Sequence, residues 1–309
     1  MPDEPAASGP VLFDRALIRA RRRRAAQLGP VTFLLDRVAD EFAERLAAVL
    51  RRFDVAADLG TPTDVVRTAL TRLPTTGTVI RSDAALDATA TATATPAPIR
   101  VAADEETLPF REASLDLVVS GLALQFVNDL PGVLVQIRRA LKPDGLFLAA
   151  LLGGETLTEL RQSFAAAESE IEGGASPRVA PFADLRELGA LLQRAGFALP
   201  VTDVDRITVR YDNAFDLMYD LRCMGATNAL LARRRTPLRR STLLRMAEIY
   251  AERFADPDGR LRATFEIVWL SGWAPHPDQR QPLKPGSAKT RLADALGAQE
   301  IPAGEKPGS

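Results

Sequence analysis

The sequence predicts an α/β protein with a mostly parallel, seven-stranded sheet, helices on both faces and a helical lid. Three observations lead to this fold class. Short apolar runs recur along the chain, helical patterns separate them, and longer helical stretches interrupt the second half. Continuous apolar runs that alternate with helices are typical of parallel strands buried on both faces. With 309 residues, 46% of them hydrophobic and 26% charged, the chain can build one large domain with additions.

Seven segments are predicted as strands. The first five are short and largely apolar, whereas the sixth alternates apolar and polar residues as a half-exposed strand does. The fifth is apolar on both faces, which favours a central place in the sheet. The predicted strands are 54–60, 78–83, 99–104, 115–120, 146–152, 203–211 and 264–273.

Apolar residues spaced three and four apart predict helices before and between these strands. The segment 84–98 is of low complexity and is interpreted as a weak helix and a loop. The predicted helices are 13–28, 32–53, 62–72, 131–141, 155–172, 183–195, 214–231 and 238–254. The predicted organisation is a disordered tail at 1–10, N-terminal helices at 11–53, a domain at 54–274 with helical insertions at 155–195 and 213–260, and a mostly disordered tail at 275–309.

The composition excludes several kinds of site. Cys223 is the single cysteine and His276 the single histidine, so a Cys/His zinc site and an intrachain disulfide are excluded, and no metal site is predicted. A serine–histidine–aspartate triad would need His276, which lies in a Pro-rich segment. With a net charge of -1, the chain as a whole lacks the excess positive charge that is typical of nucleic-acid-binding proteins.

The expected location is the bacterial cytoplasm. No run approaches the roughly 20 apolar residues that a spanning helix needs. The first ten residues are acidic and polar, unlike a secretory signal. Arginine is plentiful while lysine is nearly absent, as in proteins from GC-rich bacterial genomes.

Several segments, in order, resemble a known family. Residues 108–110, 115–120, 127–131 and 141–145 resemble the type 11 group of class I S-adenosylmethionine-dependent methyltransferases. A second set resembles a narrower family, that of the mitochondrial complex I assembly factor 5, an arginine hydroxylase, whose close relative is the malonyl-carrier-protein methyltransferase of biotin synthesis. That set is 153–157, 172–174, 176–177, 181–182, 194–197 and 224–226. The resemblance covers about residues 12–290.

The resemblance implies a Rossmann-like class I methyltransferase fold with S-adenosylmethionine bound at the carboxyl ends of the strands. Asp83 would accept from the ribose hydroxyls and Asp104 from the adenine amine. No catalytic residue is assigned. The implied cofactor-binding residues are Asp58, Gly60, Thr61, Asp83, Asp104, Glu105 and Ser120. Aspartates at strand ends are also good turn formers and helix caps, so each of these has a structural alternative.

The loop after the first strand departs from the family. It normally carries three spaced glycines, of which 58–64 keeps only Gly60, and Pro62 offers no backbone N–H. The local pattern predicts a self-capped helix, with Thr61 as N-cap, Pro62 first and Asp64 third. Such a cap satisfies donors that a ligand would otherwise use. We therefore hypothesise that cofactor binding is weakened or lost relative to the family.

The basic segment from Arg15 to Arg24 has two interpretations. It could grip an acidic partner or an anionic lipid surface. The favoured interpretation is a solvated helix face that pairs with nearby acids.

Three functions remain open. The leading one is a methyltransferase-family enzyme that acts in complex I assembly on a protein subunit, modifying an arginine by methylation or hydroxylation, and that reaches the inner membrane only through its partner. The second is a non-catalytic assembly chaperone with a degenerate cofactor site. The third is a carrier-protein O-methyltransferase. Replacing Asp83 and Asp104 by alanine would separate an enzyme from a chaperone.

Overall fold

The computed structural model describes residues 11–85, 99–276, 278 and 297. The predicted tail at 1–10, nearly all of the tail at 275–309 and most of the segment 84–98 lie outside the described residues. The chain divides into two compact units, of which the first, Met1–Pro275, holds every element described below.

In the part of the chain that the structure describes, seven strands form one sheet in the order β3-β2-β1-β4-β5-β7-β6. Strands β1 to β5 pair in parallel with one another, and β7 is antiparallel to both β5 and β6. This confirms the predicted mostly parallel, seven-stranded sheet. The strands are β1 (Phe53–Leu59), β2 (Thr76–Ser82), β3 (Ile99–Val101), β4 (Leu115–Gly121), β5 (Leu141–Leu152), β6 (Ala198–Tyr211) and β7 (Leu261–Trp273).

The starts of two strands differ from the prediction by five residues, and the other boundaries differ by three or fewer. Strand β5 begins at Leu141, which pairs with Leu115 ahead of a bulge, so the predicted turn at 142–145 lies inside the strand. Strand β6 begins at Ala198 because it pairs with β7 along almost its whole length. The chain does turn locally at 142–145, where Asp144 has a positive φ of 57°. This turn interrupts the pairing of β5 instead of preceding the strand.

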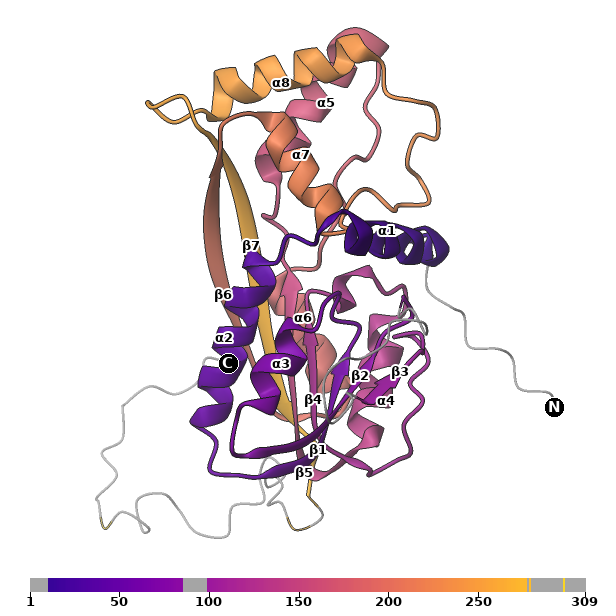
Figure 1. The fold of residues 1–309 in the computed structure, drawn as a ribbon, viewed down its shortest axis with the longest axis vertical. Helices are drawn as coiled ribbons and strands as arrows, with labels where there is room; N and C mark the ends of the chain where they lie inside the picture. The colour runs from indigo at the N-terminus through magenta and orange to yellow at the C-terminus, as the bar shows by residue number, and fades with distance from the viewer. Residues whose placement is uncertain (1–10, 86–98, 277, 279–296, 298–309) are drawn as a thin grey trace, which may run out of the picture. The chain divides into compact units, whose positions relative to one another are not determined.

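The described residues form eight α-helices, which lie on the faces of the sheet and beyond one end of it (Figure 1). They are α1 (Arg15–Leu28), α2 (Phe33–Ala47), α3 (Val65–Thr71), α4 (Leu130–Ala140), α5 (Thr158–Glu172), α6 (Leu185–Arg194), α7 (Ala214–Cys223) and α8 (Arg240–Phe254). The predicted helix 214–231 ends early because Gly225 turns the chain with a φ of +71°. The helix predicted at 32–53 likewise ends at Ala47, and the chain enters β1 at Phe53.

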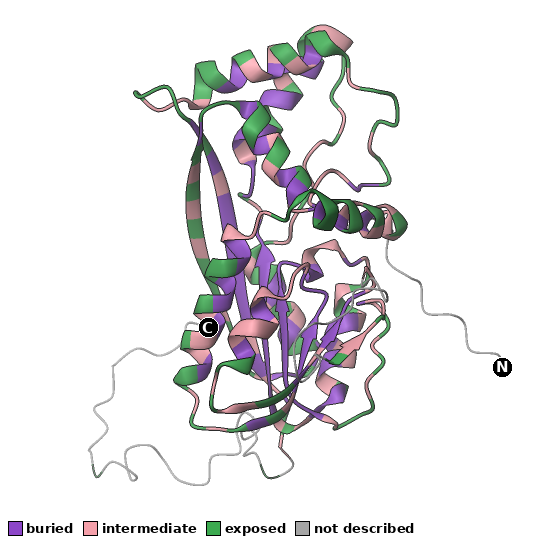
Figure 2. Cartoon of the chain, in the orientation of Figure 1, coloured by how far each residue is buried: buried purple, intermediate pink, exposed green. Residues whose placement is uncertain are grey.

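Both faces of the sheet are covered. Helices α2 and α3 pack on one face, where Phe42 and Leu46 are fully buried, and α4 and α6 pack on the other. Burying a side chain of this size contributes about 1.5–3 kcal/mol. Figure 2 shows the resulting pattern, with buried strands inside and alternating exposure along β6.

Helices α5, α7 and α8 form the predicted helical lid beyond the carboxyl ends of β4 and β5 (Figure 1). The lid is joined to the sheet by β7, and α5 packs against α8. Tyr250 of α8 is fully buried, and its hydroxyl donates to the carbonyl of Arg262 over 2.7 Å. That bond satisfies the polar end of a large apolar side chain.

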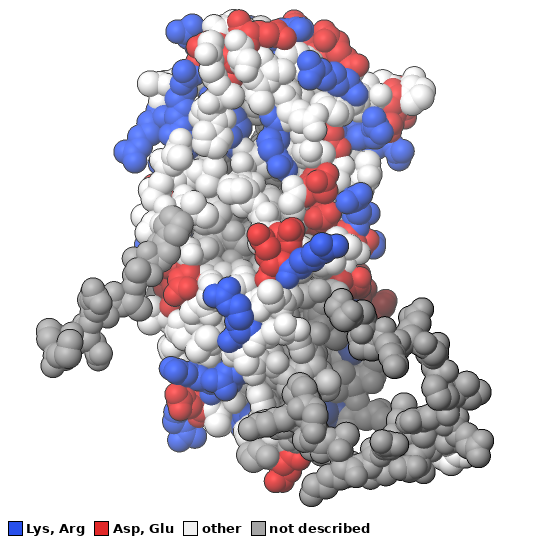
Figure 3. All heavy atoms as spheres, turned by 180° about the vertical axis from the view of Figure 1, so that it is seen from behind, with Lys and Arg blue, Asp and Glu red and all other residues white. Residues whose placement is uncertain are grey.

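Charged side chains are spread over the surface. On the face shown in Figure 3, acidic and basic residues are interspersed outside the grey region. None of the helices in the described residues is long and apolar enough to cross a membrane.

Candidate functional site

The loop after β1 is tied to the end of β4 by buried hydroxyls. The Thr61 hydroxyl donates to Asp58 Oδ1 and accepts from the backbone N–H of Gly121 over 3.0 Å. The Ser120 hydroxyl donates to the carbonyl of Leu59 over 2.8 Å. These bonds hold the carboxyl ends of the two strands together, so three predicted site residues serve one polar network.

The predicted cap at Thr61 is wrong. Helix α3 begins at Val65 with Asp64 at the N-cap position, and Thr61 lies before it in the loop. The local sequence matches a cap, but the Thr61 hydroxyl is already used by Asp58 and Gly121. Asp64 instead faces the sheet, where its carboxylate accepts from Arg81 over 3.0 Å and from Arg100 over 2.6 Å.

Gly60 is required by both its backbone and its neighbours. Its φ is +67°, and a Cβ at this position would lie 2.6 Å from Glu105 Cγ. The side chain of Glu105 therefore packs directly on the one glycine that the loop keeps.

Asp58 is fully buried at the end of β1. Burial raises its pKa to about 7, although the Thr61 hydroxyl and the charge of Arg81 favour its ionised form. Its Oδ2 atom has no hydrogen-bond partner among the described residues. A buried carboxyl with an unpartnered oxygen is typical of a group held in its protonated form.

Three arginines of α1 contact the acids that follow β2 and β3. We name Arg15, Arg19 and Arg22 the α1 arginines, and Asp83, Asp104 and Glu105 the strand-end acids. They lie close together although about sixty to ninety residues separate them in sequence.

Arg22 is the central residue of this contact. It is 8% exposed, and its Nη1 lies 3.0 Å from Glu105 Oε1, 3.7 Å from Asp83 Oδ1 and 3.0 Å from the carbonyl oxygen of Gly60. Because both acids are even more buried than Arg22, water screens this pairing little. Arg22 therefore joins the glycine loop to two strand-end acids.

Arg15 and Arg19 complete the contact. Arg15 Nη2 lies 2.7 Å from Asp104 Oδ1 and also binds Glu105, while Arg19 Nη1 lies 2.9 Å from Asp104 Oδ2. Burial disfavours the charge of Asp104, but the N–H of Glu106 and the Arg15 guanidinium outweigh it and lower its pKa. At Asp83 the balance is opposite, and burial raises the pKa despite the charges of Arg22 and Arg81.

The structure thus brings the seven predicted site residues together at the carboxyl ends of the parallel strands, in two groups. Asp58, Thr61 and Ser120 form the hydroxyl network, and the strand-end acids contact α1. Gly60 joins the groups through Arg22 and Glu105. The role of these residues as cofactor contacts stays a prediction.

The sequence interpretation missed the α1 arginines as site residues. It expected α1 to be a solvated face pairing with acids, and the pairing is present, but Arg22 is buried instead of solvated. The available signal was spacing. Positions 15, 19 and 22 are separated by four and three residues, which places them on one face of a helix.

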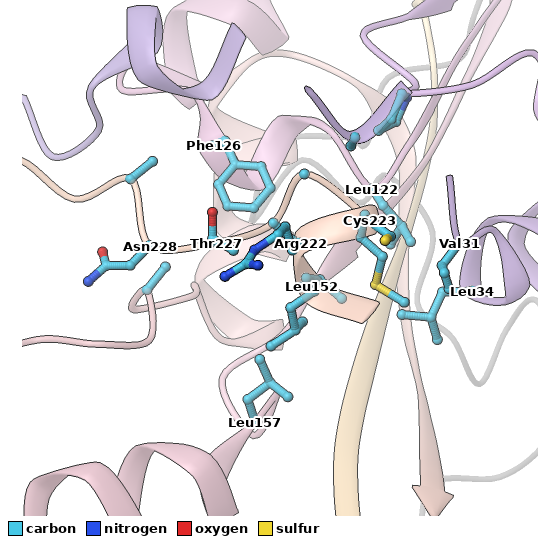
Figure 4. Close-up of a pocket in the computed structure, with 18 of the residues that line it drawn as sticks. Val31, Leu34, Leu122, Phe126, Leu152, Leu157, Arg222, Cys223, Thr227 and Asn228 are labelled. Carbon is cyan, nitrogen blue, oxygen red and sulfur yellow. The ribbon is translucent and has the colours of Figure 1, made fainter. Parts of the chain in front are cut away.

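A cavity of about 280 Å³ lies beside these acids, between α1, α2 and the lid. Its walls are mainly apolar, and the described residues that line it include no aspartate or glutamate. Figure 4 shows Leu122 and Phe126 from the segment after β4, Leu152 from β5, and Arg222 and Cys223 from the end of α7 around it. Gln125, Thr227 and Asn228 supply neutral polar groups, and Arg22, Arg178 and Arg222 supply cationic ones.

The chemistry of this edge favours an organic ligand. The strand-end acids can accept from hydroxyl or amino groups, and the cavity can take an apolar group. No cluster of three or more potential metal ligands occurs in the described part of the chain.

Comparisons with known proteins point to one family. Residues 57–149 match the model of a methyltransferase domain. The mouse protein named arginine-hydroxylase NDUFAF5, mitochondrial, is 40% identical over 299 residues, which is 96% of this chain and 87% of that protein. The malonyl-[acyl-carrier protein] O-methyltransferase of Laribacter hongkongensis is 43% identical over 190 residues, covering 62% of this chain and 61% of that one.

A solved structure supports the fold. The crystal structure of a candidate methyltransferase from Bacillus halodurans C-125 matches with a TM-score of 0.51 and 15% identity, over 76% of this chain and 98% of that chain. At this identity the likeness concerns the fold alone.

Proposed function

The chain belongs to the arginine-hydroxylase NDUFAF5 family, within the S-adenosylmethionine-dependent methyltransferase enzymes, and from this we propose that it acts on a protein subunit during the assembly of respiratory complex I. The observation that carries the proposal is the 40% identity over 96% of the chain. The match includes the lid as well as the sheet, so it extends to the walls of the cavity. We propose an arginine side chain as the target, because the relative's name describes an arginine hydroxylase.

S-adenosylmethionine is the cofactor of this enzyme family, so the edge of the sheet can be tested for its fit. The strand-end acids have suitable chemistry, since a carboxylate accepts well from vicinal hydroxyls. Their arrangement does not fit, because the α1 arginines already engage all three and Glu105 packs on Gly60. We therefore derive no chemical step through the cofactor from this arrangement.

The cavity is the proposed site for the target side chain. Its apolar walls suit the aliphatic stem of an arginine and keep water out. The described lining holds no carboxylate and three arginines, of which Arg22 and Arg178 are paired with Glu105 and Glu168 and Arg222 is exposed. The proposed acceptors for the guanidinium group are therefore the neutral side chains of Gln125, Thr227 and Asn228. Methylation and hydroxylation both remain open, and no side chain of the cavity is assigned a catalytic role.

Mass spectrometry of complex I subunits from a deletion strain tests the proposal. We expect one arginine-containing peptide to lose either a methyl group or an oxygen atom, and complementation with the parent gene to restore it. Identical spectra in deleted and complemented strains would contradict the enzyme. If complex I still assembles with an Asp83→Ala and Asp104→Ala variant, a non-catalytic chaperone would explain the result better.

The carrier-protein reaction is tested separately. Malonyl-carrier protein, S-adenosylmethionine and purified enzyme should give no methyl ester if the proposal is correct. The bacterial cytoplasm, with contact to the inner membrane only through the partner, stays a proposed location, and cell fractionation would test it.

A further inference from the structure

We infer that α1 is a gate over the carboxyl ends of the strands. It must leave the strand-end acids before S-adenosylmethionine can bind. The inference rests on the proposed function, because it concerns how the same site is regulated. The α1 arginines and the cofactor then compete for the same carboxylates. Substrate binding in the cavity would be coupled to the same motion, since Arg22 and Ala25 of α1 line that cavity.

The overlap between α1 and the expected cofactor contacts is extensive. Every strand-end acid is paired to at least one α1 arginine, and the shortest pairing of Asp104 measures 2.7 Å. Arg22 also donates to the carbonyl of Gly60. This residue lies in the loop whose backbone would contact the cofactor if the chain binds it as the resemblance implies. A ligand cannot use these acceptors while α1 holds them.

The closed arrangement leaves buried donors without partners. Arg22 Nη2 and Arg15 Nε are both buried and form no hydrogen bond among the described residues. Buried polar groups are normally satisfied, and an unsatisfied guanidinium N–H weakens the state that contains it. The closed position of α1 is therefore held less firmly than its number of ion pairs suggests.

Helix α1 can move without breaking the main core. Its buried apolar side chain Ile18 belongs to a small separate cluster with Phe13, Ala229 and Leu230, whereas α2 buries Leu35, Val38 and Phe42 in the main core. The scarcity of apolar contacts makes ion pairs the principal hold on α1.

The two ends of α1 differ in how they are fixed. At the start, the Asp14 carboxylate caps the helix by accepting from Leu17, and the Asn128 side chain accepts from the backbone of Leu12 and Phe13. At the end, Gly29 has a φ of +91° and no atom within 4 Å of the place of its Cβ. The start of α1 is therefore the fixed pivot of the gate, and the short segment from Gly29 to Thr32, before α2 begins at Phe33, is where the other end can bend.

The test compares two double variants of α1 with equal loss of charge. Arg15→Gln/Arg19→Gln removes two α1 arginines, and Arg23→Gln/Arg24→Gln is the control, since Arg23 and Arg24 are exposed and form no ion pair in the described part of the chain. Calorimetric titration with S-adenosylmethionine should show roughly tenfold or greater tightening in the first variant. The control should bind like the parent.

Hydrogen exchange on the unmodified protein gives a second readout that does not depend on a variant. With S-adenosylmethionine bound, amides of α1 should exchange faster, while those of α2 stay protected. Slower exchange in α1, or unchanged affinity in the Arg15→Gln/Arg19→Gln variant, would overturn the gate and make α1 a wall of the bound site. Absence of binding in every protein would overturn the cofactor use in the proposed function, and the gate with it.

Discussion

The two halves of the cleft are built in opposite ways. Beside β1 and β2 the space is filled by the chain's own charged side chains, with Arg22 between Asp83 and Glu105. Beside β4 and β5 it is hollow and apolar, with a cavity of about 280 Å³ and no acid in its described lining. One half of the site therefore has carboxylates that can recognise a ligand but no free space. The other half has free space but few polar side chains.

The filled half depends on mutual charge compensation. Burying one carboxylate is costly, and burying it beside a guanidinium with good geometry offsets much of that cost. The hollow half depends less on such a balance, because most of its wall is apolar, and of its three arginines Arg22 and Arg178 are paired with Glu105 and Glu168 and Arg222 is exposed. Substitutions should therefore have much larger effects in the first half than in the second.

The largest expected effect is that of Arg22→Ala. It removes the cation that Asp83 and Glu105 share, so that they keep only Arg81 and Arg15 as partners, and it leaves the buried carbonyl of Gly60 without its donor. The free energy of unfolding should fall by about 3–5 kcal/mol. Urea denaturation measures it, with the exposed Arg23→Ala as the matched control on the same helix. Equal stability of the two variants would show that the filled half is not held by these ion pairs.

Gly60→Ala should have the next largest effect. The substitution combines a φ of +67° with a Cβ placed 2.6 Å from Glu105 Cγ, so we expect a loss of about 2–4 kcal/mol. Gly29→Ala separates the two causes, because its φ is +91° but nothing lies near its Cβ, and should cost about 1 kcal/mol. If both variants lose the same stability in thermal unfolding, contact with Glu105 contributes nothing.

Asp58→Asn tests the buried carboxyl through pH. The pKa of Asp58 is raised from 3.8 to about 7 in the folded chain, so between these values the folded state holds a proton that the unfolded state has lost. The stability that protonated Asp58 gives to the parent protein is therefore lost as the pH rises from about 4 to about 7. The asparagine does not titrate, so its advantage over the parent should grow by about 2 kcal/mol from pH 5 to pH 6.5. A pH-independent difference in unfolding free energy would place the pKa of Asp58 near its ordinary value.

The smallest effect is expected in the hollow half. Ala226→Leu adds volume where the cavity can accept it, and stability should change by about 0.5 kcal/mol or less. Ala57→Leu, in the fully buried part of β1, should cost about 1–3 kcal/mol through overpacking. Similar losses in both variants would show that the cavity is closed in solution.

The sheet could be predicted because its signal is local. Each central strand is a continuous apolar run, and β4 is buried at every position, so periodicity and length identify it. The start of β5 could not be read this way, because Leu141 joins the strand only by pairing with Leu115 across a bulge.

The positions of the acids could be predicted and those of the α1 arginines could not, because only the acids are placed by the fold class. Asp83 and Asp104 follow strands, so the fold class alone brings them to one edge. Arg22 reaches Glu105 from 83 residues away in sequence, and no local pattern specifies that contact. Thr61 shows the converse error, since a locally convincing cap was displaced by hydrogen bonds to Asp58 and Gly121, which come together only in the folded chain.

The pairing of α1 with the strand-end acids also sets a charge selectivity. When the helix withdraws, three positive groups leave, while the three acids and the neighbouring Glu106, which lies 3.8 Å from Arg15, stay behind. Arg81 still pairs with Asp83, but the opened end of the strands then carries more negative than positive charge. It would prefer a cationic ligand to a neutral one of the same shape, and so would distinguish a sulfonium from the thioether that remains once its methyl group is gone.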